Sequence, residues 1–211
     1  MSAESAPKWR RLEPDQRREE IFACAAELFG ERPYAAVSTA DIAARAGVAR
    51  GLINHYFGTK RELYLAVVRR TLTLPPSAVT TLPDGSLAER TDAAVDWFLD
   101  MVSKQQKTWL AAITPEGIGR DEEVERILDD ADREAATLVL EAMGFDPTDP
   151  RWEQQIAVIR TYAGMVKAAS REWLDRATLN REQVHTVLSR VLLSLLSDVI
   201  PRAGQQTATD R

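Results

Sequence analysis

Apolar residues recur along most of the chain at the three- and four-residue spacing of a helix with one buried side. Over residues 15–30 this stripe consists of Ile21, Ala25, Leu28 and Phe29, and Pro33 follows as a helix-ending residue. Alternating apolar and polar runs, which are typical of strands, are nearly absent. The pattern therefore predicts an all-α protein.

Two short helices are predicted next, over residues 39–46 and 49–56. Gly47 lies between them and marks the turn. The second helix has an apolar side that would hold it against the core, formed by Val48, Phe57 and either Leu52 or Ile53.

Thr59 and Glu62 have the spacing of a capping box, in which a hydroxyl and a carboxylate each satisfy a free N–H at a helix start. That helix is predicted to continue to about residue 74, where two prolines and a turn-rich segment follow. We therefore predict an N-terminal domain over residues 1–74, including this connecting helix, and a second domain over residues 75–211.

A second capping box, at Ser86 and Glu89, opens a helix that is predicted to extend to about residue 107. An amphipathic pattern then predicts a helix over residues 124–142, which Gly144 ends. The second domain is thus also predicted to be helical.

The last two helices carry apolar residues on more than one side. The first of them is predicted to start with Asp149 as its N-cap and Pro150 as its first residue. The final helix starts at Asn180, and its stripe comprises Val184, Val187, Leu188, Val191, Leu192, Leu195, Leu196 and Val199. Either both helices are central in the monomer core, or they are buried against a second copy, since soluble oligomers are most often two-fold dimers. We favour a homodimer, with predicted interface residues Ile156, Ile159, Ala163, Val166 and Val184.

The two short helices around Gly47 have the arrangement of a helix-turn-helix, whose second helix enters the DNA major groove. Arginine can bind guanine with two hydrogen bonds, asparagine can bind adenine, and tyrosine can donate to phosphate. The second helix leaves such side chains exposed: Arg50, Asn54, His55 and Tyr56. Taken alone, a short helix, glycine and helix fit plain helical packing equally well, and His55 also suits a structural role.

Three stretches, residues 18–29 (REEIFACAAELF), 39–48 (TADIAARAGV) and 55–63 (HYFGTKREL), resemble the DNA-binding domain of the TetR family of transcriptional regulators. The resemblance covers about residues 17–68. It implies an all-α subunit with an N-terminal helix-turn-helix domain and a helical ligand-binding and dimerisation domain. It further implies a homodimer, usually a repressor, that a small-molecule effector releases from its operator DNA.

The same resemblance assigns roles to individual positions. Those matching phosphate contacts are Thr39, Tyr56 and Lys60, and those matching base or sugar contacts are Arg50, Gly51, Leu52, Asn54 and His55. The family's usual Thr-Leu-Tyr is Leu52-Ile53-Asn54 here, so a common phosphate-contacting tyrosine is replaced by a possible adenine reader. The palindromic operator that a dimer would bind therefore cannot be taken over from relatives.

The net charge of −5 at first argues against a nucleic-acid partner, because phosphate binding depends on Lys and Arg. Residues 1–70, however, contain 12 basic and 9 acidic residues, a net charge of +3, and the remaining 15 basic and 23 acidic residues give −8. We also expect Arg10 and Arg11 to form either a DNA-contacting arm or a solvated one. The acidic second part would be repelled by DNA, so only the first part is expected to dock.

Composition excludes several classes of protein. The chain has no run of ~20 apolar residues and no apolar signal segment, which predicts a cytoplasmic protein without a membrane span. One cysteine, Cys24, and two histidines argue against a disulfide, a metal site or a cofactor. Nucleophile-elbow and P-loop motifs are missing, so we predict no enzyme activity. A helical enzyme and an all-α adaptor remain the alternatives.

Large soft side chains are concentrated in the second domain, where they either fill the core or line a cavity: Trp97, Phe98, Met101, Trp109, Met143, Tyr162 and Met165. Because cations are scattered there, we predict an apolar or amphipathic ligand, such as a fatty-acyl or aromatic compound. The acidic residues over 121–125 and 129–132 are predicted to be solvated helix faces and not a metal site.

Overall fold

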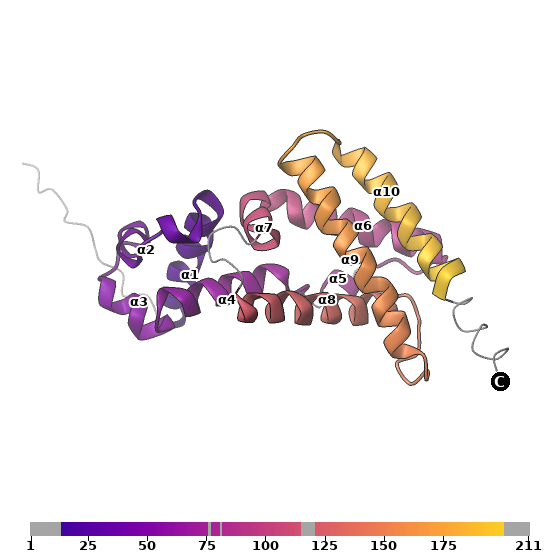
Figure 1. Cartoon of the computed structure of the whole chain (residues 1–211), viewed down its shortest axis with the longest axis horizontal. Helices are drawn as coiled ribbons and strands as arrows, with labels where there is room; N and C mark the ends of the chain where they lie inside the picture. Colours follow the sequence, from indigo (N-terminus) through magenta and orange to yellow (C-terminus); the bar gives the residue numbers. More distant parts are fainter. Residues whose placement is uncertain (1–13, 76, 81, 115–120, 201–211) are drawn as a thin grey trace, which may run out of the picture.

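The computed structural model describes residues 14–75, 77–80, 82–114 and 121–200, and every regular element in these ranges is helical. Arg10 and Arg11, the predicted arm, lie outside the described residues. Figure 1 shows an elongated molecule with α2 and α3 at one end and α9 and α10 toward the other. The predicted all-α class is confirmed.

Helices α1–α4 form the N-terminal bundle, which contains a helix-turn-helix (Figure 1). Their bounds are Pro14–Glu31 for α1, Thr39–Ala46 for α2, Arg50–Phe57 for α3 and Lys60–Leu72 for α4, with a 3₁₀ turn, η1, at Tyr34–Ala36. Gly47 adopts the left-handed conformation, with φ of 63°, and lets the chain turn sharply between α2 and α3. The predicted capping box of Thr59 and Glu62 is present, and α4 ends two residues before the predicted end.

The remaining helices form the C-terminal bundle. They are α5 (Ser77–Thr80), α6 (Leu87–Lys104), α7 (Gln106–Ile113), α8 (Glu122–Ala142), α9 (Trp152–Leu174) and α10 (Arg181–Ser194), which continues into a π turn, η2 (Leu195–Val199). The capping boxes at Ser86 and at Asn180 are formed, so both of these predicted helix starts are confirmed. No helix in the described ranges is both long and apolar enough to cross a bilayer.

The prediction that the helix from Ser86 reaches residue 107 is wrong. Gln105 leaves helical geometry, with φ of −136° and ψ of 40°, and a separate helix, α7, begins at the next residue. Trp109 and Ile113 of α7 are buried in the cluster that also contains the core of α1. The break therefore turns an apolar face toward the N-terminal bundle, which the periodicity along one helix did not indicate.

The predicted N-cap at Asp149 is also wrong, because α9 begins at Trp152. The Asp149 carboxylate accepts hydrogen bonds from the backbone N–H of Arg151, at 2.8 Å, and from its guanidinium. The Arg151 guanidinium lowers the pKa of Asp149 to about 2. Asp149 thus stabilises the turn that precedes the helix.

Two apolar clusters hold the described chain together, and they do not divide where the predicted domains divide. The first joins the N-terminal bundle to α7 and to Val124, Ile127 and Ala131 of α8. The second joins α6, α9 and α10 to Ala136 and Leu140, further along the same α8. The division at residue 74 remains a prediction, and α8 contributes to both cores.

Within the single chain, the residues predicted to form the dimer interface are covered to different extents. Ile156, Ile159 and Val184 are at most 3% exposed, whereas Ala163 and Val166 are half-buried and line a pocket. Their role in a dimer interface stays a prediction. Periodicity indicated that α9 and α10 have two apolar faces, but not which face the chain's own core covers.

Candidate nucleic-acid interface and ligand pocket

Helix α3 has one face held by the core and one face open. Ile53 is fully buried and Leu52 is half-buried against the first cluster, whereas Gly51, Asn54 and His55 are exposed. Side chains three and four positions apart share a helix face, so the exposed residues form one surface. A Cβ added at Gly51 would meet no atom within 4 Å, so another molecule can approach the helix backbone there. Leu52 packs part of its surface against the core, and its predicted contact with bases stays a prediction.

Arg50 and Thr39, predicted to read a base and to bind phosphate, lie next to each other. Arg50 Nε donates a hydrogen bond to the Thr39 hydroxyl oxygen at 3.0 Å. Thr39 is the first residue of α2, behind a capping box formed by Ser38 and Asp41. A helix N-terminus with free N–H groups and an adjacent guanidinium favours an anion such as a phosphate.

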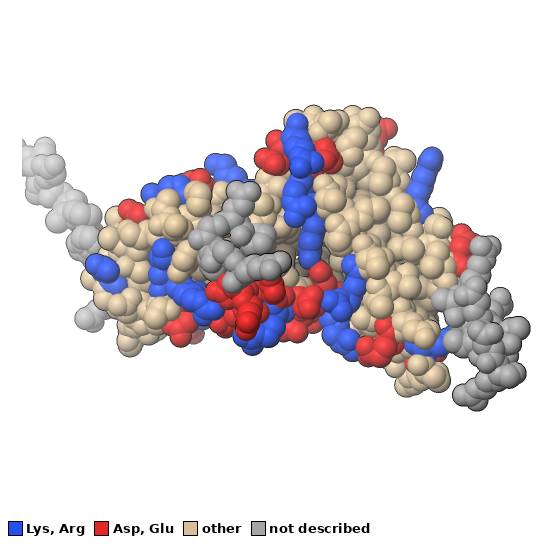
Figure 2. Space-filling model, in the orientation of Figure 1, with Lys and Arg blue, Asp and Glu red and all other residues tan. Residues whose placement is uncertain are grey.

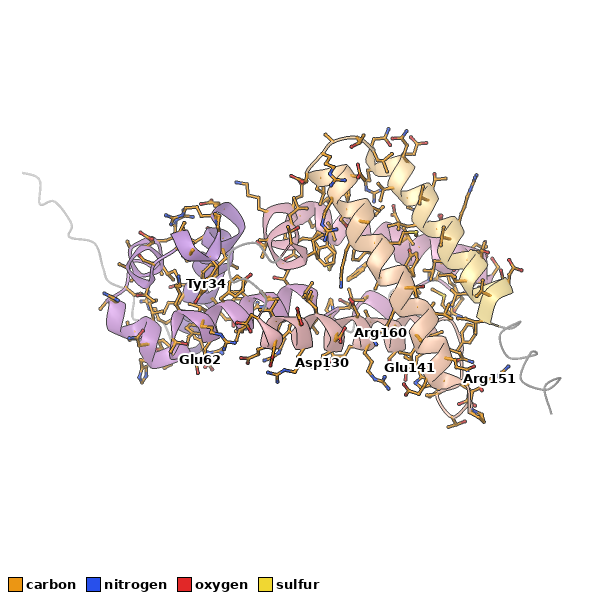
Figure 3. All side chains as sticks on the ribbon, viewed as in Figure 1. Tyr34, Glu62, Asp130, Glu141, Arg151 and Arg160 are labelled. Carbon is orange, nitrogen blue, oxygen red and sulfur yellow. The ribbon has the colours of Figure 1, made fainter. Side chains whose placement is uncertain are left out.

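Lys60 is engaged within the protein. Its Nζ donates to the carbonyl oxygens of Tyr34 and Val37, both at 2.9 Å, and lies 3.9 Å from the centre of the Tyr34 ring. Lys60 thereby fastens η1 to the start of α4; Figure 3 labels Tyr34 at this end of the molecule. An ammonium has three N–H donors, so one is left for the predicted phosphate contact. The sequence did not indicate this clamp, because its acceptors are backbone oxygens more than twenty residues away.

Tyr56 is half-buried at the edge of the first cluster. Its ring meets the His55 ring edge-on, with centroids 5.1 Å apart. The Arg18 guanidinium lies over the neighbouring Phe57 ring, with its carbon 4.9 Å from the ring centroid. The last turn of α3 is therefore an aromatic surface bordered by a cation.

Several basic side chains of the N-terminal bundle are paired with acids of the same bundle. Arg45 binds Glu27 and Glu31, at 3.3 and 3.1 Å, and the bond from Arg45 lowers the pKa of Glu31. Arg70 binds Glu19 at 2.6 Å. In Figure 2 basic and acidic atoms alternate over this end, and acidic atoms gather over the middle of the visible face. The bundle's net positive charge is therefore not a broad basic patch, and Arg50 stands out by its position on the open face of α3.

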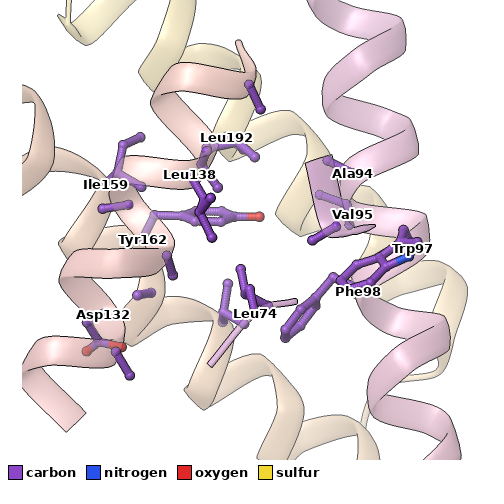
Figure 4. Close-up of a pocket in the computed structure, with 18 of the residues that line it drawn as sticks. Leu74, Ala94, Val95, Trp97, Phe98, Asp132, Leu138, Ile159, Tyr162 and Leu192 are labelled. Atoms are coloured by element: carbon purple, nitrogen blue, oxygen red, sulfur yellow. The ribbon is translucent and has the colours of Figure 1, made fainter. Parts of the chain in front are cut away.

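A pocket of about 130 Å³ lies within the C-terminal bundle, with walls from α6, α8 and α9 and from the end of α4. Most of the predicted lining residues are in its wall: Trp97, Phe98, Trp109, Met143 and Tyr162. Met101 and Met165 are not; they pack against the first and second clusters. Figure 4 shows Tyr162 and Leu138 on one side of the pocket and Trp97 and Phe98 on the other.

Two polar features lie in the pocket wall. The buried Tyr162 hydroxyl donates to the Leu188 carbonyl oxygen at 3.1 Å, and burial raises the pKa of Tyr162. Lys167 Nζ lies 2.6 Å from Asp132 Oδ2, and the two side chains are 17% and 22% exposed. Asp132 was predicted to lie on a solvated face, which is wrong. Its neighbours Asp129 and Asp130 are exposed as predicted, and Asp129, at 74% exposure, pairs with Arg160, which Figure 3 labels beside α8.

One ion-pair cluster joins the N-terminal bundle to the pocket wall. The Arg61 guanidinium, at the start of α4, binds Asp121 at 2.9 Å and Glu123 at 2.7 Å. These two acids stand at the start of α8, the helix that contributes most of the pocket's small apolar residues. The two ion pairs therefore link the start of α4 directly to the start of α8.

Known families match both parts of the chain. The description "Bacterial regulatory proteins, tetR family" matches residues 21–67, and "Tetracyclin repressor-like, C-terminal domain" matches residues 87–195. The second match alone covers more than half of the chain. Both sequence profiles thus cover the two helical bundles that the structure describes.

Curated relatives and solved structures agree with these matches. HTH-type transcriptional activator FasR of Mycolicibacterium smegmatis is 38% identical over 96 residues, 44% of this chain and 43% of FasR. HTH-type transcriptional regulator BetI of Klebsiella pneumoniae is 34% identical over 102 residues, 45% of this chain and 52% of BetI. The chain spans about half the length of these relatives. A tetR-family regulator structure from Streptomyces coelicolor, 20% identical, covers 95% of this chain and 91% of its own with a TM-score of 0.70, a likeness of fold.

Proposed function

The chain belongs to the TetR family of bacterial regulatory proteins, and from that premise we propose that it is a DNA-binding transcriptional regulator controlled by a small molecule. The observation that carries the proposal is the open face of α3. Its exposed side chains, Arg50, Asn54 and His55, are of types that bind DNA, while Ile53 on the opposite face holds the helix in the core. A regulator acting on DNA would work in the cytoplasm.

In the proposed complex α3 lies in the major groove. Arg50 would read guanine and Asn54 adenine, and Thr39 and Tyr56 would bind phosphates on either side. Lys60 would add its third N–H to a phosphate while it keeps η1 in place. Sequence preference would then depend on few side chains.

A second copy of the chain would supply a second helix-turn-helix. We call the helix-turn-helix of each copy, α2 and α3, its reader. The exposed large apolar side chains in the described residues are Val187 and Val199, 43% and 40% exposed, and half-buried Val191 and Leu195 lie between them in sequence. We propose that the dimer contact lies on this face of α10 and η2, because the four residues form an apolar stripe whose exposure to water is unfavourable. The two readers of a dimer would bind half-sites of a palindrome about 34 Å apart, or a multiple of that distance.

The pocket in the C-terminal bundle is the proposed effector site. Its walls suit an apolar or amphipathic molecule. A ligand that displaces α8 or the end of α4 would move the reader through the Arg61 cluster and change the spacing of the two readers. Release from the operator would make the protein a repressor, which is the direction we propose.

Selection of bound DNA from a random pool, using the full chain, tests the DNA-binding part. We expect enrichment of a palindrome, and no enrichment with the double variant Arg50→Ala and Asn54→Ala, which removes two exposed side chains without touching the core. A reporter gene placed behind the selected sequence then measures the direction of regulation. Selection that yields no palindrome would contradict the proposal.

A further inference from the structure

We propose that the pocket selects ligands whose polar group is uncharged, namely apolar molecules that end in a hydroxyl, carbonyl or amide. This inference rests on the proposed effector site. It comes from the two charged residues among those that line the pocket in the described chain, Asp132 and Lys167. They neutralise each other across 2.6 Å, so the wall carries no net charge.

Both charged side chains have little contact with water, since Lys167 is only 17% exposed and Asp132 only 22%. Around them the wall is formed by alanine, valine and leucine side chains such as Ala135, Leu138 and Val166. A charged ligand group in these surroundings would lose its hydration and leave one net charge in an apolar space, which is costly. An uncharged group loses much less.

A charged ligand group also meets a charge of its own sign in this pair. A ligand carboxylate that accepts a hydrogen bond from Lys167 lies beside the Asp132 carboxylate, and a ligand ammonium that donates to Asp132 lies beside the Lys167 ammonium. Each arrangement leaves one net charge without a counter-charge in poorly hydrated surroundings, which is costly. The ion pair therefore disfavours both signs of charge.

The intact pair can nevertheless bind a neutral polar group. The Lys167 ammonium has three N–H donors and uses one for Asp132, and the carboxylate retains acceptor lone pairs. A hydroxyl, carbonyl or amide can use these without breaking the pair. Figure 4 shows Asp132 across the pocket from Trp97 and Phe98, so the polar end of the ligand would lie at Asp132 and its apolar end against the two rings.

Binding of three matched probes to the full chain tests the inference: 1-octanol, octanoate and octylammonium, measured by calorimetry at pH 7. They share an eight-carbon chain and differ in the charge of the end group. We expect octanol to bind at least about tenfold more tightly than either ion, since an unpaired, mostly buried charge costs well over the 1.4 kcal/mol that a factor of ten represents. Tighter binding of octanoate or octylammonium would overturn the inference.

Two charge variants sharpen the test. Asp132→Asn leaves Lys167 unpaired and should shift the preference to octanoate, whereas Lys167→Met leaves Asp132 unpaired and should shift it to octylammonium. Unchanged selectivity in both variants, with helicity retained by circular dichroism, would show that the pair does not set the preference. The ranking in the unmodified protein stands as a test even where a variant does not fold.

A variant with a filled pocket separates this inference from the proposed function. Ala135→Phe places a ring in the pocket wall and should abolish octanol binding. If none of the probes binds the unmodified protein, the effector site fails together with the inference. If they bind and the charged probes are preferred, only the inference fails.

Discussion

The Arg50 guanidinium is tied to the Thr39 hydroxyl by a 3.0 Å hydrogen bond from Nε, so the first residues of the two helices of the helix-turn-helix are joined side chain to side chain. The bond limits the directions in which the rest of the guanidinium can point. A guanidinium that is held before DNA arrives loses less conformational entropy on binding. Thr39 is therefore predicted to matter for base reading as well as for phosphate contact.

Arg50→Ala should weaken operator binding by about 1–3 kcal/mol, mainly through one base pair, because a bidentate contact to guanine is lost. Thr39→Val should relax the same preference by a smaller amount, since it frees the guanidinium without removing it. Fluorescence anisotropy with the selected operator and its single-base variants measures both. Equal losses on all sequences for Arg50→Ala would assign Arg50 to phosphate.

Gly51→Ala should raise stability and weaken DNA binding together. The helix gains about 0.5–1 kcal/mol because alanine restricts the unfolded chain, and the methyl group meets no protein atom within 4 Å. That open space is where DNA would approach. Gly164→Ala, likewise free of neighbours, is the control for stability alone. Thermal unfolding and operator titration compare the two, and unimpaired DNA binding by Gly51→Ala would move the DNA away from this face.

Lys60→Ala should destabilise the protein by about 1–3 kcal/mol, because two hydrogen bonds to a charged donor are lost. If the third N–H binds phosphate, the slope of the logarithm of the DNA-binding constant against the logarithm of salt concentration should also become shallower by about one. Urea unfolding measures the first effect and operator titrations in rising salt the second. Lys104→Ala, an exposed lysine on α6, controls for loss of a charge. An unchanged free energy of unfolding would argue against the clamp.

Val187→Asp should give a folded monomer. Val187 is 43% exposed and is not one of the buried core residues, so the chain should still fold, while the aspartate places a charge in the proposed dimer contact. Leu192→Asp should instead unfold the protein, since Leu192 is 2% exposed in the second cluster. Sedimentation and circular dichroism separate these outcomes. A Val187→Asp protein that still sediments as a dimer would place the interface elsewhere.

Gly30→Ala should destabilise the contact between α1 and α7. A Cβ at this position would lie 3.0 Å from the backbone nitrogen of Thr108 and 3.1 Å from the carbonyl carbon of Lys107, and backbone cannot move aside as a side chain can. We expect a loss of about 1–3 kcal/mol, as for overpacked cores. The unfolding midpoint tests this, and an unchanged midpoint would mean that α7 shifts freely over α1.

Features that depend on neighbours along the chain could be predicted from the sequence. The capping boxes at Thr59 and Ser86 and the helix start at Asn180 are local, and the exposed face of α3 follows from helical spacing. The DNA-contact roles of the α3 residues remain predictions. What could not be predicted depends on partners far along the chain, such as the pairing of Asp132 with a lysine on another helix.

The contacts of Lys60 could not be predicted either. Its acceptors are backbone carbonyl oxygens, which every residue has, so no residue type in the sequence marks them. The break at Gln105 was missed for a related reason, because the apolar face of α7 packs in the cluster that contains the core of α1, and helical spacing does not show that contact. Likewise, the apolar residues of α9 and α10 predicted two apolar faces on each helix, but not which face packs against the rest of the same chain. In each case the missing information was the three-dimensional position of another element.

Helix α8 contributes residues to both apolar clusters, so the chain cannot be truncated between the two bundles without exposing one of the clusters. A fragment ending after residue 74 would lose the cover that Trp109, Ile113 and Val124 provide for the N-terminal bundle. Such a fragment would aggregate more readily than the whole chain. Chimeric regulators that graft this reader onto a foreign sensor would therefore need α7 and the first turns of α8 to travel with it.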